Sequence, residues 1–208
     1  MKKIIAIIIT ALILVSCTTV NMNSPRCLDP GQNGIGVYGL YIGDPVEQDE
    51  SEDNDQSNGT GAVHFTFRHG LKNQNELGFG VGSLGGDLFF KHNFLGKDSS
   101  FYLTLIGSAG YLWWVVPEIS VGVLSGIDIG KNLIIYGGYR QHILLGEKIN
   151  DGENSYGHLI GGIEIMPEKK ISMLIEFNQT ITEIELDENS DLDEIYMNVV
   201  GLGLSYKF

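Results

Sequence analysis

Apolar and polar residues alternate along most of the chain, and the pattern is clearest at the carboxyl end. Val200, Leu202, Leu204, Tyr206 and Phe208 fall on one face of an extended strand, while the residues between them are mostly small or polar. A period of two with unlike faces is typical of a β-strand that lies between two different environments. The sequence therefore predicts a protein built from two-faced strands.

Ten segments of the chain show this pattern and are predicted to be strands. Most are close to the length of about 9–11 residues that a tilted strand needs to cross a membrane. No stretch after residue 17 has the period of a helix. The predicted strands cover residues 35–42, 63–68, 77–82, 88–94, 101–114, 119–129, 133–144, 156–166, 171–182 and 199–208.

The connections between these strands alternate in length. Short turns lie at 73–75, 96–100, 130–132 and 167–170, whereas the connections at 44–61, 146–155 and 185–194 are long and polar. The connections after the third and fifth strands are shorter exceptions. Bacterial outer-membrane barrels have short periplasmic turns and longer outside loops. Residues 33–208 are therefore predicted to form an all-β, closed, antiparallel, up-and-down transmembrane β-barrel of ten strands. Eight is the alternative, if the third and fourth segments form one distorted hairpin.

The chain is acidic and rich in glycine. Its 208 residues include 28 Gly, 9 Tyr and 9 Phe, which suits a single glycine-rich antiparallel β domain. With 13 basic and 26 acidic residues, the formal net charge is -13. A nucleic-acid partner is not expected, because phosphate binding requires a basic surface. The acidic residues cluster in the long connections, which are predicted to be solvated extracellular loops.

The first 17 residues have the features of an export signal. A short basic start precedes an apolar run over residues 4–15, which is too short for an ordinary transmembrane helix. The following Leu14-Val15-Ser16-Cys17 resembles the lipobox of bacterial lipoproteins. The resemblance implies that residues 1–16 are a cleaved signal peptide and that Cys17 is acylated, for example with palmitate. It also implies delivery to the outer membrane by the lipoprotein-sorting machinery.

Residues 17–32 contain two prolines and little periodicity, so they are predicted to form a lipidated, flexible tether. Cys27, the second of the two cysteines, lies in this tether. With Cys17 acylated, Cys27 has no partner in the same chain. It is therefore either a free thiol or bonded to another molecule.

The end of the chain carries a second resemblance. Tyr206 and Phe208 resemble the carboxy-terminal signal by which outer-membrane β-barrel proteins are recognised by their assembly machinery. That signal usually has a polar residue seven positions before the final aromatic, where this chain has Gly201. The resemblance implies outer-membrane lipid and the barrel-assembly machinery as partners.

If the apolar faces meet lipid, several charged residues face the lumen. Arg68, Lys91, Arg140, Glu164 and Glu176 are predicted to form a charge network inside the barrel. A catalytic or ion-conducting site is the alternative role. Pairing is favoured because a narrow barrel has no room for a wide channel and unpaired buried charges are costly. Other polar residues predicted to face the lumen are His64, Thr66, His142, His158, Asn178 and Lys207.

The sequence offers little support for enzymatic chemistry. Arg140-Gln-His142 resembles part of the outer-membrane lipid A deacylases, but Ile, Leu and Leu follow His142, so the nucleophilic serine is missing. No metal and no cofactor is expected, because the histidines are scattered and no glycine-rich phosphate loop opens a helix. The aromatic residues are predicted to form girdles at the membrane interfaces rather than sugar platforms. They include Tyr38, Trp113 and Trp114.

These features predict a non-enzymatic, lipid-anchored outer-membrane barrel that is structural and surface-exposed, or porin-like for small solutes. One alternative is a lipid-tethered periplasmic protein that binds an apolar ligand as lipocalins do. Another is a barrel enzyme that acts on membrane lipid. The membrane barrel and the lipocalin-like protein differ in the direction of Phe65, Phe67, Ile175 and Phe177. These side chains point outward in a membrane barrel and fill the interior of a soluble one.

Overall fold

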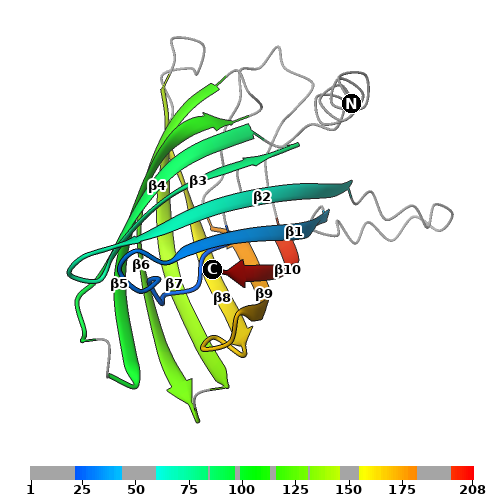
Figure 1. Ribbon diagram of the computed structural model, residues 1–208. Coiled ribbons are helices and arrows are strands. Elements are labelled where there is room, and N and C mark those ends of the chain that lie inside the picture. The colour runs from blue at the N-terminus through cyan, green and yellow to red at the C-terminus, as the bar shows by residue number, and fades with distance from the viewer. Residues whose placement is uncertain are drawn as a thin grey trace, which may run out of the picture.

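The computed structural model describes residues 22–43, 60–83, 85–96, 99–112, 116–130, 132–145, 155–181 and 198–208. They form ten antiparallel strands in one closed barrel (Figure 1). Each strand pairs with its neighbours in the chain, and β1 pairs with β10 to close the sheet. The barrel thus has ten strands, not eight, in the predicted up-and-down order. No helix within the described residues is long and apolar enough to cross a membrane.

The strands match the predicted segments, although many begin or end a few residues further out. The predicted strand bounds put a connection at residues 115–118, which is too late in the chain: Pro117 and Glu118 lie inside β6 and pair with Tyr111 and Gly110 of β5. Proline is tolerated there because it lies close to the start of the strand. The bounds are β1 Asn33–Gly43, β2 Thr60–Leu71, β3 Asn75–Gly82, β4 Gly85–Asn93, β5 Phe101–Leu112, β6 Val116–Ile129, β7 Leu133–Leu144, β8 Ser155–Ile165, β9 Ile171–Thr180 and β10 Asn198–Lys207.

The turn between β2 and β3 shows how local sequence ends a strand. Asn73 and Gln74 have φ angles of 56° and 58°, in the left-handed region. Such angles suit the tight turn of a hairpin, and asparagine adopts them more readily than most residues. The side chain of Asn75 then donates a hydrogen bond to the Lys72 carbonyl (2.9 Å). The predicted short turn is therefore built from residues that favour it.

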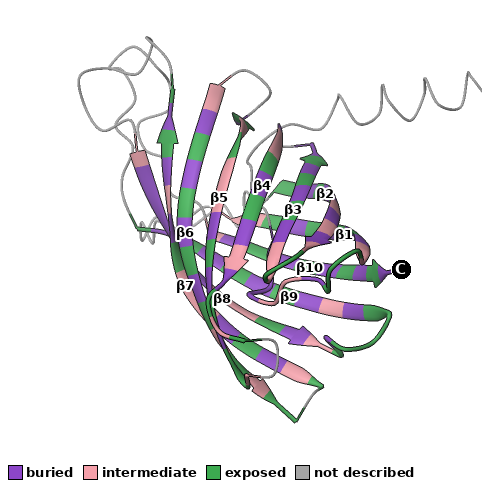
Figure 2. Ribbon diagram, turned by 60° about the vertical axis from the view of Figure 1, so that its left-hand side comes forward, coloured by how far each residue is buried: buried purple, intermediate pink, exposed green. Residues whose placement is uncertain are grey.

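Buried and exposed residues alternate along the strands (Figure 2), as expected if successive side chains point to the inside and the outside of the barrel. Thr66 and Glu176 point inward and are buried. The four residues whose direction distinguishes a membrane barrel from a soluble one all point outward. Phe65, Ile175 and Phe177 are between 38% and 44% exposed, and Phe67 is partly exposed on the same face. The outside of the barrel is therefore apolar, and the inside holds many polar and charged side chains beside a smaller apolar cluster, unlike the apolar interior of a lipocalin.

One aromatic residue predicted for an interface girdle lies in the lumen instead. Tyr38 is 2% exposed, because it shares the inner face of β1 with Leu40 rather than the outer face with Tyr41. Gly203 on β10 makes room for its ring, since a Cβ there would lie 1.9 Å from Tyr38 Cδ1. Trp113 and Trp114, which were predicted for the same girdles, lie outside the described residues.

The chain before β1 runs inside the barrel, and we call residues 22–28 the plug segment. Met22, Asn23, Ser24 and Leu28 are all buried, and Ser24 and Leu28 form hydrogen bonds with Glu164 of β8 and Glu76 of β3, which follow much later in the chain. The described part of the predicted tether is thus not a free linker but packs against the inner wall. Residues 17–21, the remainder of that prediction, lie outside the described residues.

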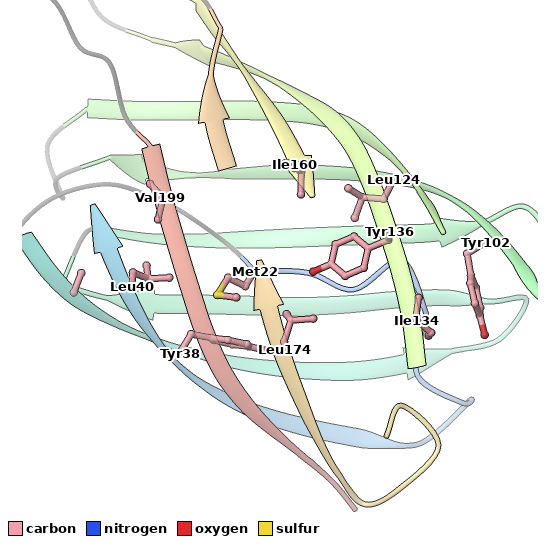
Figure 3. Close-up of a cluster of buried hydrophobic side chains, with 11 residues drawn as sticks. Met22, Tyr38, Leu40, Tyr102, Leu124, Ile134, Tyr136, Ile160, Leu174 and Val199 are labelled. Atoms are coloured by element: carbon pink, nitrogen blue, oxygen red, sulfur yellow. The ribbon is translucent and has the colours of Figure 1, made fainter. Parts of the chain in front are cut away.

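Met22 anchors the plug segment in the lumen (Figure 3). Its side chain belongs to a buried cluster with Tyr38 and Leu40 of β1 and Val199 of β10. A Cβ on Gly201 would lie 2.2 Å from the Met22 sulfur, so glycine at that position leaves the space that methionine fills. Burying a methionine side chain contributes about 1.5–3 kcal/mol. The plug segment therefore has an apolar contact as well as the polar ones described below.

We predict that Met22→Cys and Gly201→Cys, combined in a Cys27→Ser background, form a disulfide under mild oxidation. A Cβ on Gly201 would lie 2.2 Å from the Met22 sulfur in the lumen, and a disulfide requires such proximity. The bond is measured as a linked peptide pair by mass spectrometry without reduction. Met22→Cys with Leu202→Cys is the control, because Leu202 faces outward. Equal crosslinking of both pairs would contradict the position of the plug segment.

Candidate functional site

The lumen is the candidate functional site, and its polar residues form two groups along the barrel. One group surrounds the plug segment in the half near the short turns. The other lies on β6, β7 and β8 towards the long connections. Every residue that the sequence predicts to face the lumen is buried, including the five of the predicted charge network: Arg68, Lys91, Arg140, Glu164 and Glu176.

Lys91 and Glu76 form the centre of the first group. The Lys91 ammonium lies 2.8 Å from Glu76 Oε1, and both side chains are fully buried. Lys91 also donates hydrogen bonds to the carbonyls of Ser24 (3.1 Å) and Arg26 (3.2 Å). Glu76 Oε2 accepts from the Leu28 amide (2.8 Å). The ion pair therefore binds the backbone of the plug segment through both of its members.

Glu164 and Thr104 hold the plug segment from β8 and β5. Ser24 Oγ donates to Glu164 Oε2, and Thr104 Oγ1 donates to the Pro25 carbonyl, both at 2.5 Å. The other oxygen of Glu164 lies 3.8 Å from Lys207 Nζ. A buried polar group that loses its partner costs about 1–3 kcal/mol, so these contacts fix the segment in place.

The other predicted network residues make separate contacts. Arg68 Nη2 donates to Ser205 Oγ (2.5 Å). Glu176 accepts hydrogen bonds from Tyr136 (2.7 Å) and Asn178 (3.0 Å). The predicted residues thus occupy the lumen without joining into one network of ion pairs. Glu76, the partner of Lys91, was not predicted, although the β3–β4 hairpin makes the two residues direct register partners and so offers a signal for it.

Glu118 organises the second group. Its Oε1 accepts from His142 Nδ1 (2.5 Å), and its Oε2 accepts from the Tyr156 hydroxyl (2.9 Å). The His142 ring stacks on Tyr156 with centroids 4.6 Å apart, and the His158 ring centroid lies 4.9 Å from that of His142. The strand pattern of the sequence leaves Glu118 in a connection between two strands, so its position in the lumen follows only from the structure.

The second group is not an assembled Ser–His–acid triad. Ser120 on β6 is the register partner of His142, so a serine, a base and an acid come close together. Ser120 Oγ, however, lies 2.7 Å from Ser108 Oγ, and His142 Nε2 has no hydrogen-bond partner among the described residues. A serine without a bond to a base is not activated as a nucleophile. The geometry therefore gives no support to the hydrolase alternative at this position.

A cavity of about 40 Å³ lies between the plug segment and the β8–β9 turn. Arg26, Cys27, Arg68 and Lys207 are among the residues that line it, and the volume suits only a few water molecules. Burial raises the pKa of the Cys27 thiol to about 11, so the thiol is protonated at neutral pH and is a poor nucleophile. Within the described ranges, no cluster of His, Cys, Asp or Glu could hold a metal ion.

The two aromatic residues of the predicted assembly signal lie on the outer face at the short-turn end. The rings of Tyr206 and Phe208 stack with centroids 5.9 Å apart, and both are exposed. Lys207 between them points inward and donates to the Pro167 carbonyl. The role of the two aromatics in assembly stays a prediction.

We predict that Lys91→Met lowers the free energy of unfolding by roughly 3–5 kcal/mol, because it leaves Glu76 as an unpaired buried carboxylate. The double variant Lys91→Met/Glu76→Gln is expected to recover part of this loss, since no buried charge is left alone. Urea unfolding in detergent micelles measures both values. Lys72→Met, at the exposed β2–β3 turn, is the control and should change stability by less than about 0.5 kcal/mol. Additive losses in the double variant would show that the pair is not coupled.

Comparison with known proteins supports the fold alone. No protein-family model and no curated protein matches the sequence. Among solved structures, the chain is similar to an outer-membrane channel from Pseudomonas putida F1, with a TM-score of 0.55 and 8% identity over 91% of this chain and 100% of that chain. The NanC porin gives a TM-score of 0.49 and 8% identity, covering 84% of this chain and 100% of its own. Neisserial surface protein A gives 0.41 and 10%, covering 86% and 99%. The chain therefore has a closed, ten-stranded, antiparallel barrel fold of the kind found in outer-membrane proteins.

Proposed function

We propose that this chain is a non-enzymatic outer-membrane barrel, anchored by lipid on Cys17, that has a plugged lumen and displays acidic loops at the cell surface. One observation carries the proposal: apolar side chains cover the outside of a closed sheet whose inside is polar and filled. An apolar surface of this extent is stable in the hydrocarbon of a membrane, whereas in water it would cause the protein molecules to associate with one another. Closed antiparallel barrels with this arrangement are typical of bacterial outer membranes.

The connections support one orientation of the barrel in the membrane. The short turns and the carboxyl end lie at the same end of the barrel, and the long connections lie at the other. Bacterial barrels keep their short turns on the periplasmic side. The connections after β1 and β9, which carry many of the acidic residues, then face the outside of the cell.

The plug segment limits where a lipid on Cys17 could sit. Met22, which is buried in the lumen, follows Cys17 by five residues. An extended chain covers about 3.4 Å per residue, so the two residues are at most roughly 17 Å apart. An acyl anchor on Cys17 would therefore stay close to the barrel instead of hanging on a long linker.

The proposal is tested on outer membranes from cells that express the protein and grow with radioactive palmitate. The wild type is expected to take up label and to migrate differently before and after boiling, because the folded barrel resists detergent. Cys17→Ala is expected to lose the label and to keep the shift in mobility. A wild type without the shift would refute the membrane barrel. Label retained in Cys17→Ala would refute the anchor.

A porin-like role is the second candidate, and the fold shared with an outer-membrane channel favours it. The plug segment opposes it, since Met22 and its neighbours occupy the lumen. In planar lipid bilayers we expect no stable open state for the wild type and a conducting path after deletion of residues 22–28. The oxidised and reduced forms of Met22→Cys/Gly201→Cys serve as a matched pair, because only the reduced form lets the segment move. A wild type that conducts as well as an open deletion variant would establish the porin-like role instead.

A further inference from the structure

Arg140 is a buried cation without a direct partner in the described part of the chain. It lies on β7, is 4% exposed, and its Nε and Nη2 atoms have no hydrogen-bond partner there. Glu176 acts on Arg140 electrostatically, but the oxygens of Glu176 already accept from Tyr136 and Asn178. Arginine stays charged in proteins, and a buried charge without a partner is costly. Arg140 therefore has no anion in direct contact among the described residues.

Two histidines present free nitrogens beside Arg140. His158 is its register partner on β8, and His142 lies two residues further along the inner face of β7. The Nε2 atoms of both rings are buried and have no hydrogen-bond partner among the residues described. On the other side Arg140 pairs with Gly122 of β6, which has no side chain to fill the space. The inner wall of β7 and β8 thus gathers four nitrogen atoms without partners.

The contact with Glu118 decides which of these nitrogens accept and which donate. A carboxylate only accepts hydrogen bonds, so His142 Nδ1 carries the proton that it shares with Glu118 Oε1 (2.5 Å). In the neutral ring His142 Nε2 is then an acceptor and needs a donor from a ligand. The second Glu118 oxygen is bound by the Tyr156 hydroxyl (2.9 Å), which keeps the carboxylate and the ring in place.

We propose that Arg140, His142 and His158 bind a small carboxylate, with a preference for one that carries a hydroxyl beside the carboxylate. The Nε and Nη2 atoms form one edge of the guanidinium and can donate two parallel hydrogen bonds to the two carboxylate oxygens. His158 Nε2 supplies a third donor when it holds the ring proton. The neighbouring hydroxyl donates to His142 Nε2, the one acceptor of the group. A 2-hydroxy acid meets all of these requirements at once.

The position of the plug segment determines from which end of the barrel such a ligand enters. Its polar contacts with Glu76, Lys91 and Thr104 lie near the short turns, whereas Arg140 is four residues from the other end of β7, or about 13 Å along the strand. The ligand enters from the side of the long connections. Only the assignment of that end to the cell surface rests on the proposed function, whereas binding itself can be measured on purified protein in detergent.

Equilibrium dialysis with radioactive lactate, on refolded protein that shows the heat-dependent shift in mobility, tests the proposal. The wild type is expected to bind one lactate per chain and to bind propanoate, which lacks the hydroxyl, several-fold more weakly. Arg140→Met should weaken the binding of both by about 100-fold or more, because two charge-assisted hydrogen bonds are lost. Arg140→Lys should still lose about tenfold, since an ammonium cannot form the bidentate contact.

His142→Phe separates recognition of the hydroxyl from recognition of the carboxylate. It should keep the binding of propanoate and remove the preference for lactate, because Nε2 is lost while a ring remains against Tyr156. Lys72→Gln removes one positive charge at an exposed turn and should leave lactate binding unchanged. The proposal is overturned if folded wild type binds no lactate or if Arg140→Met binds it normally. Inorganic phosphate that competes better than lactate would also overturn it, since the site would then prefer a tetrahedral anion.

Discussion

Closure of the sheet is the constraint on which the rest of the structure depends. At the seam, the Asn33 amide donates to the Phe208 carbonyl and the Phe208 amide donates to the Asn33 carbonyl, each at 2.9 Å. From there β1 and β10 pair along the length of β1. An open strand edge in hydrocarbon would leave backbone groups unpaired at a cost of several kcal/mol each. Closure removes both edges, and the period of two then separates an apolar outside from a polar inside.

The closed interior creates a second requirement, which the plug segment meets. Charged side chains on the inner wall cannot all reach bulk water, so they need partners within the barrel. An irregular backbone segment has the complementary problem, because its own amides and carbonyls lack a strand or helix to pair with. Lys91, Glu76 and Thr104 solve both problems together by binding the backbone of the plug segment. This explains how a segment without regular structure can be buried.

The strands could be predicted from sequence because they depend on a local pattern and on the lengths of connections. The same two-residue alternation places Tyr38 on the inner face of β1. The girdle prediction for Tyr38 is wrong because it rests on the residue type and not on this alternation. The plug segment could not be predicted, since its contacts join residues as far apart as Ser24 and Glu164 and its prolines resemble those of a linker. In the lumen the residue types were predictable but their partners were not. Arg140 lacks a direct partner because Tyr136 and Asn178 already bind Glu176, and because the register places Glu164 six residues along β8 from His158, the residue opposite Arg140.

The position of the plug segment also has a consequence for the order of events in assembly. The segment continues directly into β1, and β1 is one of the two strands that meet at the seam. The other, β10, follows the remaining strands in the chain, so the wall closes only when all ten strands are present. After that the segment is enclosed on all sides by covalent chain and hydrogen-bonded sheet. It can no longer leave sideways between two strands, and its only way out is lengthwise, through one end of the cylinder and past Lys91 and Glu76.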